Sequence, residues 1–171
     1  MKKLVAIALL CTALLAHALP EAVRKGEAGW RQWGSGEMTW FGFSLYRATL
    51  WVAGNAVETS PSALQLDYLR DIPRERLVQV SLDEMSRLGA DARQLQRWEP
   101  ELRRVFPDVK EGDSIIGVHY PGRGAQFYYQ GQPSGEVADP EFARRFFGIW
   151  LDTESRSPVL RTALLKRPES R

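Results

Sequence analysis

The alternation of hydrophobic and polar residues predicts strands in both halves of the chain. Residues 41–52 are mostly apolar and aromatic, and we interpret residues 38–52 as one long strand that follows an entering strand and a turn at GSG. Apolar side chains occupy alternate positions of residues 63–69, as on a half-buried strand. The segments SIIGVHY and AQFYYQ are joined by the glycine-rich PGRG, and GQPSGEV follows them. We therefore expect a hairpin and a further short strand there.

The period of the pattern becomes helical after the third predicted strand. Between residues 73 and 88 apolar residues recur on one face of a helix, with Asp71 as a candidate N-cap and Gly89 as a stop. On a helical wheel Arg74 falls among the apolar residues and Arg76 among the polar ones. Three further helices are predicted over residues 91–106, over residues 140–151 and after Ser157-Pro158. Pro100 should disturb the first of them.

The order of these elements indicates a fold class. Strands come first, then two helices, a hairpin and two more helices, with short polar turns between the hairpin strands. This order is typical of an α+β fold in which a large antiparallel sheet carries a layer of helices on one face.

The N-terminus has the layout of a secretory signal peptide. Lys2 and Lys3 precede an apolar run that is too short to span a bilayer, and Ala16-His17-Ala18 is an A-x-A cleavage site. We therefore expect residues 1–18 to be removed and residues 19–171 to form one periplasmic domain without a stable membrane anchor. Cleavage would remove two of the 23 Lys and Arg residues and leave 21, which equals the 21 Asp and Glu residues. A formally neutral domain favours neither nucleic acid nor an anionic membrane surface as a partner.

The usual signatures of catalysis and of metal binding are missing. Cys11 lies in the predicted signal peptide, so the mature chain offers no thiol, and no nucleophile elbow, P-loop or dinucleotide fingerprint is found. His119 is the one histidine after residue 18, and a lone histidine on a strand is more often packed than catalytic. We expect no catalytic residue, no metal site and no cofactor, and in particular no strong haem site. The many aromatic residues suit either a large core or a cleft for a flat or long apolar ligand, with Tyr hydroxyls and an Arg as polar groups.

Four segments together resemble the chalcone isomerase-like family, in particular its exported bacterial branch. They are GFSLYRATLWV, LDYLRDIPRERLVQVSLDEMSRLG, VKEGDSIIGVHYPGRGAQFYYQGQPSGEV and DPEFARRFFGIWL, and they cover nearly all of the mature chain. The resemblance implies an open-faced β-sandwich, which is a large antiparallel sheet with a helical layer against it and a ligand cleft between the two.

The resemblance also permits a test for the family's cofactor-free ring closure. The plant enzymes use an arginine, a threonine, a tyrosine, a lysine and an asparagine. In this sequence the arginine position falls at Gly36 and the threonine position at Ala48. The tyrosine position falls at Pro73 or Arg74, the lysine position at Arg76 or Leu77, and the asparagine position at Val80 or Ser81. Such a reaction needs a cation for the phenolate and donors for the enolate. No ordered set of these groups is present, so chalcone isomerase activity is not expected, although an arginine remains near a position that the enzymes fill with Tyr or Lys.

Non-catalytic members of the family bind fatty acids or haem, which sets the first hypothesis. It is an exported, non-catalytic protein that binds a small apolar ligand, such as a fatty acid or similar carboxylate. The second hypothesis is an isomerase or lyase with a different set of groups, and the third is a structural or interaction domain without a ligand. Because the family's cleft threonine falls at Ala48, the even-numbered face of the long strand should look toward the helices, with Arg47 pointing away. The candidate ligand-binding residues are then Ser44, Tyr46, Ala48, Arg74, Leu77 and Ser81.

Overall fold

The computed structural model describes residues 19–166, and the predicted signal peptide lies outside them. The helices are α1 (Glu21–Arg24), α2 (Arg74–Arg87), α3 (Ala92–Val105), α4 (Pro140–Leu151) and α5 (Pro158–Leu165). The strands are β1 (Arg31–Trp40), β2 (Phe43–Val52), β3 (Ser62–Tyr68), β4 (Ser114–Tyr120), β5 (Gly124–Tyr129) and β6 (Gln132–Val137).

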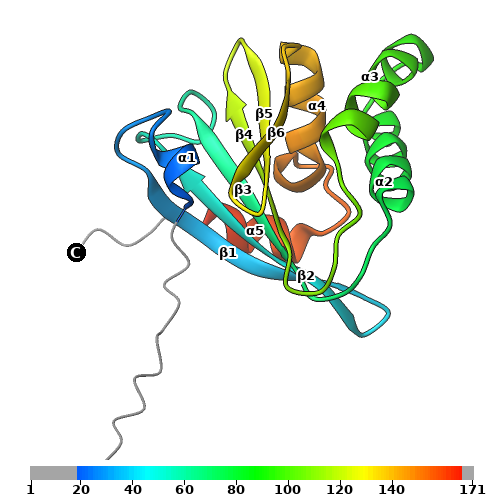
Figure 1. The fold of residues 1–171 in the computed structure, drawn as a ribbon, viewed down its shortest axis with the longest axis horizontal. Helices are drawn as coiled ribbons and strands as arrows, with labels where there is room; N and C mark the ends of the chain where they lie inside the picture. Colours follow the sequence, from blue (N-terminus) through cyan, green and yellow to red (C-terminus); the bar gives the residue numbers. More distant parts are fainter. Residues whose placement is uncertain (1–18, 167–171) are drawn as a thin grey trace, which may run out of the picture.

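The six strands form one antiparallel sheet in the order β1-β2-β3-β4-β5-β6, and every strand pairs with its neighbour in sequence (Figure 1). Helices α2 to α5 lie on one face, over a core of alternate side chains from the strands. The predicted α+β architecture of an open antiparallel sheet with helices is therefore confirmed. The opposite face is not wholly bare, because Leu19 and Val23 pack there on Ile116 and Tyr128.

The expected long strand over residues 38–52 is wrong, because the chain reverses at Phe41 and Gly42. Both residues have positive φ angles, 47° and 78°, which is the geometry of a type I′ hairpin turn. The expected turn at GSG is also wrong, since these residues lie inside β1. The two glycines have a packing role there. A Cβ atom on Gly34 would lie 2.3 Å from the Ala163 carbonyl oxygen, and one on Gly36 would lie 2.8 Å from Leu160 Cδ1. Glycine thus allows α5 to lie directly on β1.

The β1–β2 ladder contains two β-bulges. Between the pairs Thr39–Ser44 and Met38–Tyr46, strand β2 has one extra residue, Leu45. Nearer the other end of the ladder, Trp33 is an extra residue in β1. Each bulge puts two residues opposite one and changes which face the following side chains occupy.

The helical layer covers the sheet unevenly. Helix α4 packs on β4 and β5, α5 packs on β1 and β2, and α3 contacts β6. Helix α2 packs on α3 and α4 rather than on the strands, so it stands away from the sheet. Helix α3 continues through Pro100 without the expected disturbance, and Asp91 caps it with a capping box. The N-cap of α2 is Pro73 and not Asp71. Space is therefore left between α2 and the middle of the sheet.

Candidate functional site

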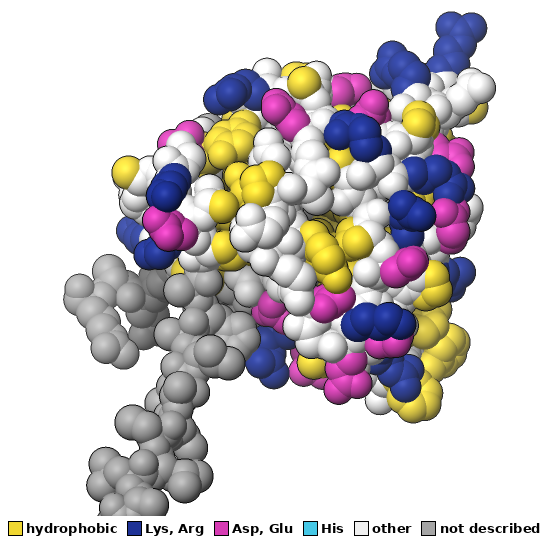
Figure 2. Space-filling view, viewed as in Figure 1, with side chains coloured by type: hydrophobic (Ala, Val, Ile, Leu, Met, Phe, Trp, Pro, Cys, Tyr) yellow, Lys and Arg dark blue, Asp and Glu magenta, His cyan; other side chains and the backbone are white. Residues whose placement is uncertain are grey.

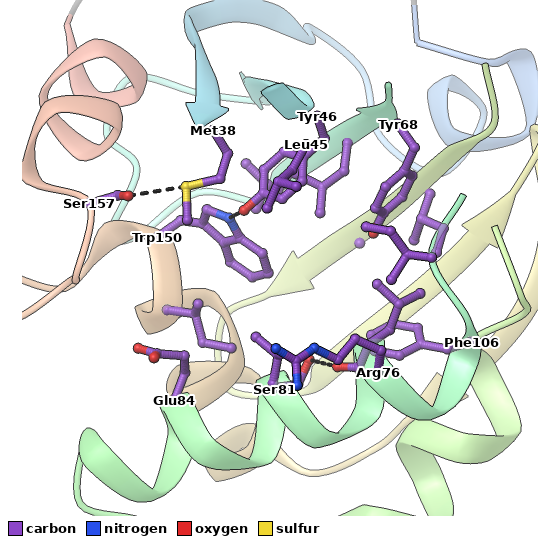
Figure 3. Close-up of a pocket in the computed structure, with 18 of the residues that line it drawn as sticks. Met38, Leu45, Tyr46, Tyr68, Arg76, Ser81, Glu84, Phe106, Trp150 and Ser157 are labelled. Atoms are coloured by element: carbon purple, nitrogen blue, oxygen red, sulfur yellow. Dashed lines mark hydrogen bonds between the residues drawn. The ribbon is translucent and has the colours of Figure 1, made fainter. Parts of the chain in front are cut away.

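A cavity of about 690 Å³ occupies the space between α2 and the sheet (Figure 3). This volume lies within the usual range for sites that bind small molecules. Its floor comes from β2, β3 and β4, its roof from α2, and its far wall from α4 and residues 155–160. The cavity exists because α2 rests on other helices, so side chains from the strands do not fill the gap beneath it.

The walls of the cavity are mainly apolar. Aliphatic side chains from β3 and β4 form the floor, and aromatic side chains of α4 stand opposite them. The main apolar wall residues are Leu64, Leu66, Ile115, Phe127, Phe146, Phe147 and Trp150. Most of these residues also belong to the central core, so the wall is held in place by the packing that stabilises the fold. Such a surface suits the hydrocarbon or ring part of a ligand.

Two tyrosines from neighbouring strands supply the polar groups of the floor. Tyr46 and Tyr68 are directly paired across β2 and β3, and their ring centroids lie 5.8 Å apart. The Tyr46 hydroxyl accepts a hydrogen bond of 2.9 Å from Trp150 Nε1, which leaves its own proton free to be donated. The Tyr68 hydroxyl has no hydrogen-bond partner within residues 19–166, and Figure 3 shows it directed into the cavity.

Both hydroxyls are protonated at neutral pH. Burial raises the pKa of Tyr46 to about 12, against the effect of the Trp150 hydrogen bond, and the negative charge of Glu84 adds to the rise. Burial also raises the pKa of Tyr68, and the neighbouring Tyr46 contributes in the same direction. The floor therefore presents two hydrogen-bond donors rather than an ionised base.

The charged groups of the α2 wall differ in their pairing. Glu84 is nearly buried, and its oxygens accept from Arg87 Nη2 at 2.9 Å and Arg156 Nε at 3.0 Å. Arg76, by contrast, has no ion-pair partner within the described residues, and in Figure 3 its side chain extends along α2 toward Ser81. The Glu84 carboxylate is thus neutralised, whereas the Arg76 guanidinium remains available to a ligand.

Three of the six candidate residues line the cavity, namely Tyr46, Leu77 and Ser81. Ser44 does not, because the bulge at Leu45 reverses the alternation that we extended through the strand. Leu45 and Tyr46 both reach the cavity, and the Ser44 hydroxyl instead donates to a carboxylate oxygen of Glu37 on the other face.

Ala48 and Arg74 also lie outside the cavity wall. Ala48 faces the helical layer but is fully buried opposite Gly36, in the region that α5 covers. Arg74 is the exposed first residue of α2, with its backbone N–H bonded to Asp108 and its guanidinium 4.0 Å from Glu75. Arg47 is exposed and lies opposite Glu37 in the β1–β2 register, on the face away from the cavity.

The helical wheel misplaced the two arginines because α2 has two apolar sides. Val78 and Met85 are fully buried against other helices, whereas Leu77 and Ser81 face the cavity. The wheel assigns one inward direction to the whole helix. Because this direction falls between the two apolar sides, Arg74 is wrongly assigned to the inward face. The sequence does contain a signal for Arg76, since it lies four residues before Val80, on the same side of a helix.

Tyr68 and Trp150, the two partners of Tyr46, were not among the candidate residues. Tyr68 was recognised as part of a half-buried strand and Trp150 as part of an aromatic set. Neither could be placed beside Tyr46, because strand register and the contact between α4 and β2 are not local properties of the sequence.

The described chain offers no arrangement for a metal ion. Residues 19–166 contain no cluster of three or more His, Asp, Glu or Cys side chains that could hold one. His119 is stacked on Phe147 with ring centroids 5.1 Å apart, and burial lowers its pKa. None of the helices in the described part of the chain is both long and apolar enough to cross a bilayer.

Comparisons with known proteins agree with this architecture. A family model described as chalcone isomerase-like matches residues 17–166. Among solved structures, a fatty-acid binding protein of Arabidopsis thaliana is similar, with a TM-score of 0.63 and 12% sequence identity. The alignment covers 81% of this chain and 87% of that protein. Among curated protein sequences, no match was found. At this level of identity the structural likeness concerns the fold.

Proposed function

Because the chain belongs to the chalcone isomerase-like family, we propose that it is a non-catalytic member that binds a small apolar carboxylate, such as a fatty acid, between sheet and helices. One observation carries the proposal. The cavity has apolar walls, two protonated tyrosine hydroxyls and, in its α2 wall, an arginine without an ion-pair partner in the described chain. The fatty-acid binding protein with a similar fold supports the same ligand class.

The polar groups suit a carboxylate better than a neutral head group. A guanidinium forms strong, charge-assisted hydrogen bonds with a carboxylate, and Arg76 lies at the rim where such a group would meet water. Tyr46 and Tyr68 can each donate one hydrogen bond from the floor. The hydrocarbon part would then lie against the leucines and the aromatic residues of α4, and its burial would supply most of the affinity.

Substitution of Arg76 tests the polar end of the site. Arg76→Gln is expected to weaken fatty-acid binding about tenfold or more, since a hydrogen bond to a charged group contributes roughly 1.5–3 kcal/mol. Arg74→Gln makes the same change two residues away, outside the cavity wall, and should leave the affinity nearly unchanged. Displacement of a fluorescent fatty acid from the purified protein measures both. Equal losses in the two variants would mean that Arg76 does not hold the carboxylate.

We also propose that the protein belongs to the exported bacterial branch of the family and acts in the periplasm. The support is the charged start, the apolar run and the Ala16-His17-Ala18 sequence. Expressed in a Gram-negative host, the protein should appear in the periplasmic fraction with Leu19 as its first residue, as N-terminal sequencing would reveal. Recovery from the cytoplasm with residues 1–18 attached would contradict the export proposal and leave the binding proposal intact.

A further inference from the structure

The β1–β2 hairpin ends in a cluster of exposed aromatic side chains. Trp40, Phe41 and Phe43 are 54%, 85% and 57% exposed, and they surround the tight turn. Figure 1 shows the hairpin extending beyond the body of the molecule at the lower right, and Figure 2 shows yellow side chains gathered there. Proteins rarely expose contiguous large apolar side chains without a partner for them. We call these three residues the aromatic tip.

The sequence of the turn is locally unfavourable. Phe41 has a φ angle of 47°, a region that bulky side chains seldom adopt. A type I′ turn strongly prefers Asn-Gly or Asp-Gly, so a phenylalanine before Gly42 is unfavourable locally. Within the described chain the ring of Phe41 makes an aromatic contact only with the adjacent Trp40. The folded chain thus gains little from this side chain, which suggests that its contact lies outside the molecule.

The aromatic tip is continuous with the mouth of the cavity. Trp40 belongs both to the tip and to the cavity wall, together with Met38 and Thr39 of the same strand. Arg70 joins the two as well, because it lines the cavity and its guanidinium carbon lies 4.7 Å from the centre of the Phe43 ring. Val80, another exposed apolar residue, is on the opposite wall. A surface that received the tip would therefore lie close to the cavity mouth.

The shape of the tip favours a bilayer over a second protein molecule. Three side chains on a narrow, convex turn offer much less than the ~800 Å² that each partner buries in a standard protein interface. A convex tip with tryptophan at its base and phenylalanine at its end suits the boundary between lipid head groups and acyl chains, where aromatic residues are enriched. The guanidinium of Arg70, which lacks an ion pair within residues 19–166, would meet the phosphate groups at that depth.

We infer that the aromatic tip docks the protein on the surface of a lipid bilayer and turns the cavity mouth toward the lipid. The inference rests on the proposed function, since an apolar carboxylate partitions into bilayers and would be exchanged there. Docking would be carried by insertion of the aromatic side chains and not by net charge. It therefore agrees with the formal neutrality of residues 19–171.

The substitution Phe41→Asn tests this role without endangering the fold. Asparagine before Gly42 is the preferred pair for a type I′ turn, so the melting temperature should stay the same or rise. Co-sedimentation with vesicles of phosphatidylethanolamine and phosphatidylglycerol at 3:1 should show the opposite effect, with partitioning reduced about tenfold, because a phenyl group no longer leaves water. Phe41→Trp should restore binding. Val159→Asn removes an equally exposed apolar side chain from α5, at 83%, and should have no effect. All proteins are prepared in the same way and their N-termini are determined, so that only chains that begin at the same residue are compared.

Several results would overturn the inference. They are undiminished vesicle binding by Phe41→Asn, equal losses in Phe41→Asn and Val159→Asn, or a wild-type protein that does not sediment with vesicles. A wild-type dimer that Phe41→Asn converts to a monomer, without vesicle binding, would assign the tip to a second copy instead. Fatty-acid affinity measured without vesicles should be the same in Phe41→Asn and wild type. That measurement separates failure of the docking inference from failure of the binding proposal.

Discussion

Tryptophan in place of Ser81 is expected to reduce fatty-acid affinity about 100-fold and to leave the protein folded. Ser81 is buried in the α2 wall, and its hydroxyl is bonded only to the Leu77 carbonyl oxygen of its own helix among the described residues. An indole there would occupy the space in which the ligand should lie, and forcing both into one site costs roughly 1–3 kcal/mol or more. The helix itself should tolerate the change, because no side-chain hydrogen bond to another element is lost.

Ser86→Trp is the matched control for this experiment. Ser86 lies on the exposed side of the same helix, outside the cavity wall, so the same substitution there should not affect affinity. Isothermal titration with a fatty acid would measure the affinities, and thermal melts would verify folding. Wild-type affinity in Ser81→Trp would place the ligand somewhere other than this cavity.

The second large effect is expected at Gly34. Gly34→Ala should lower the free energy of unfolding by about 3 kcal/mol, at the upper end for overpacked sites, and the melting temperature by roughly 6–12 °C. The added methyl group would meet two backbone carbonyl oxygens of α5, those of Ala163 and Leu164, at 2.3 and 2.4 Å. A backbone cannot rotate away, so the whole helix must shift from β1.

Two neighbouring substitutions calibrate the Gly34 result. At Gly36 the nearest atom is the end of the flexible Leu160 side chain, so Gly36→Ala should cost less than Gly34→Ala. Ser35→Ala changes an exposed residue between them and should be nearly neutral. If denaturant unfolding gave the same stability for Gly34→Ala as for Ser35→Ala, the direct contact between α5 and β1 would be wrong.

The fold class was predictable because its signals are local. Asp139 followed by Pro140 begins α4 as expected, and the strand predicted over residues 63–69 is β3, although it is buried on both faces rather than on one. The turn at Phe41 and Gly42 was missed for the same reason, since an aromatic residue in a left-handed conformation carries no turn signal. Its position is fixed by pairing along the whole of β1 and β2, which outweighs the local preference.

The candidate site was predictable only in part, because it depends on phase and register. Alternation along β2 is valid only as far as the bulge at Leu45, so it placed Tyr46 correctly in the cavity wall and Ser44 on the wrong side. The wheel for α2 identified Leu77 as inward, and the family resemblance pointed to Ser81, but the wheel could not distinguish the side that packs on other helices from the side that faces open space. That distinction depends on how far α2 stands from the sheet, which no property of the α2 sequence alone specifies.

The bulges at Leu45 and Trp33 have a consequence for insertions and deletions. One extra residue lies in each strand of the same ladder, so the two shifts cancel, and only the segment between them is out of phase with the ends. Loss of Leu45 or of Trp33 would close the corresponding bulge without changing any other pair, because the residues on either side of it already face consecutive residues of the partner strand. Loss of a paired residue elsewhere in the hairpin would instead offset one strand by one position and exchange inward and outward side chains beyond the lesion. Single-residue deletions in this hairpin should therefore be tolerated best at these two positions.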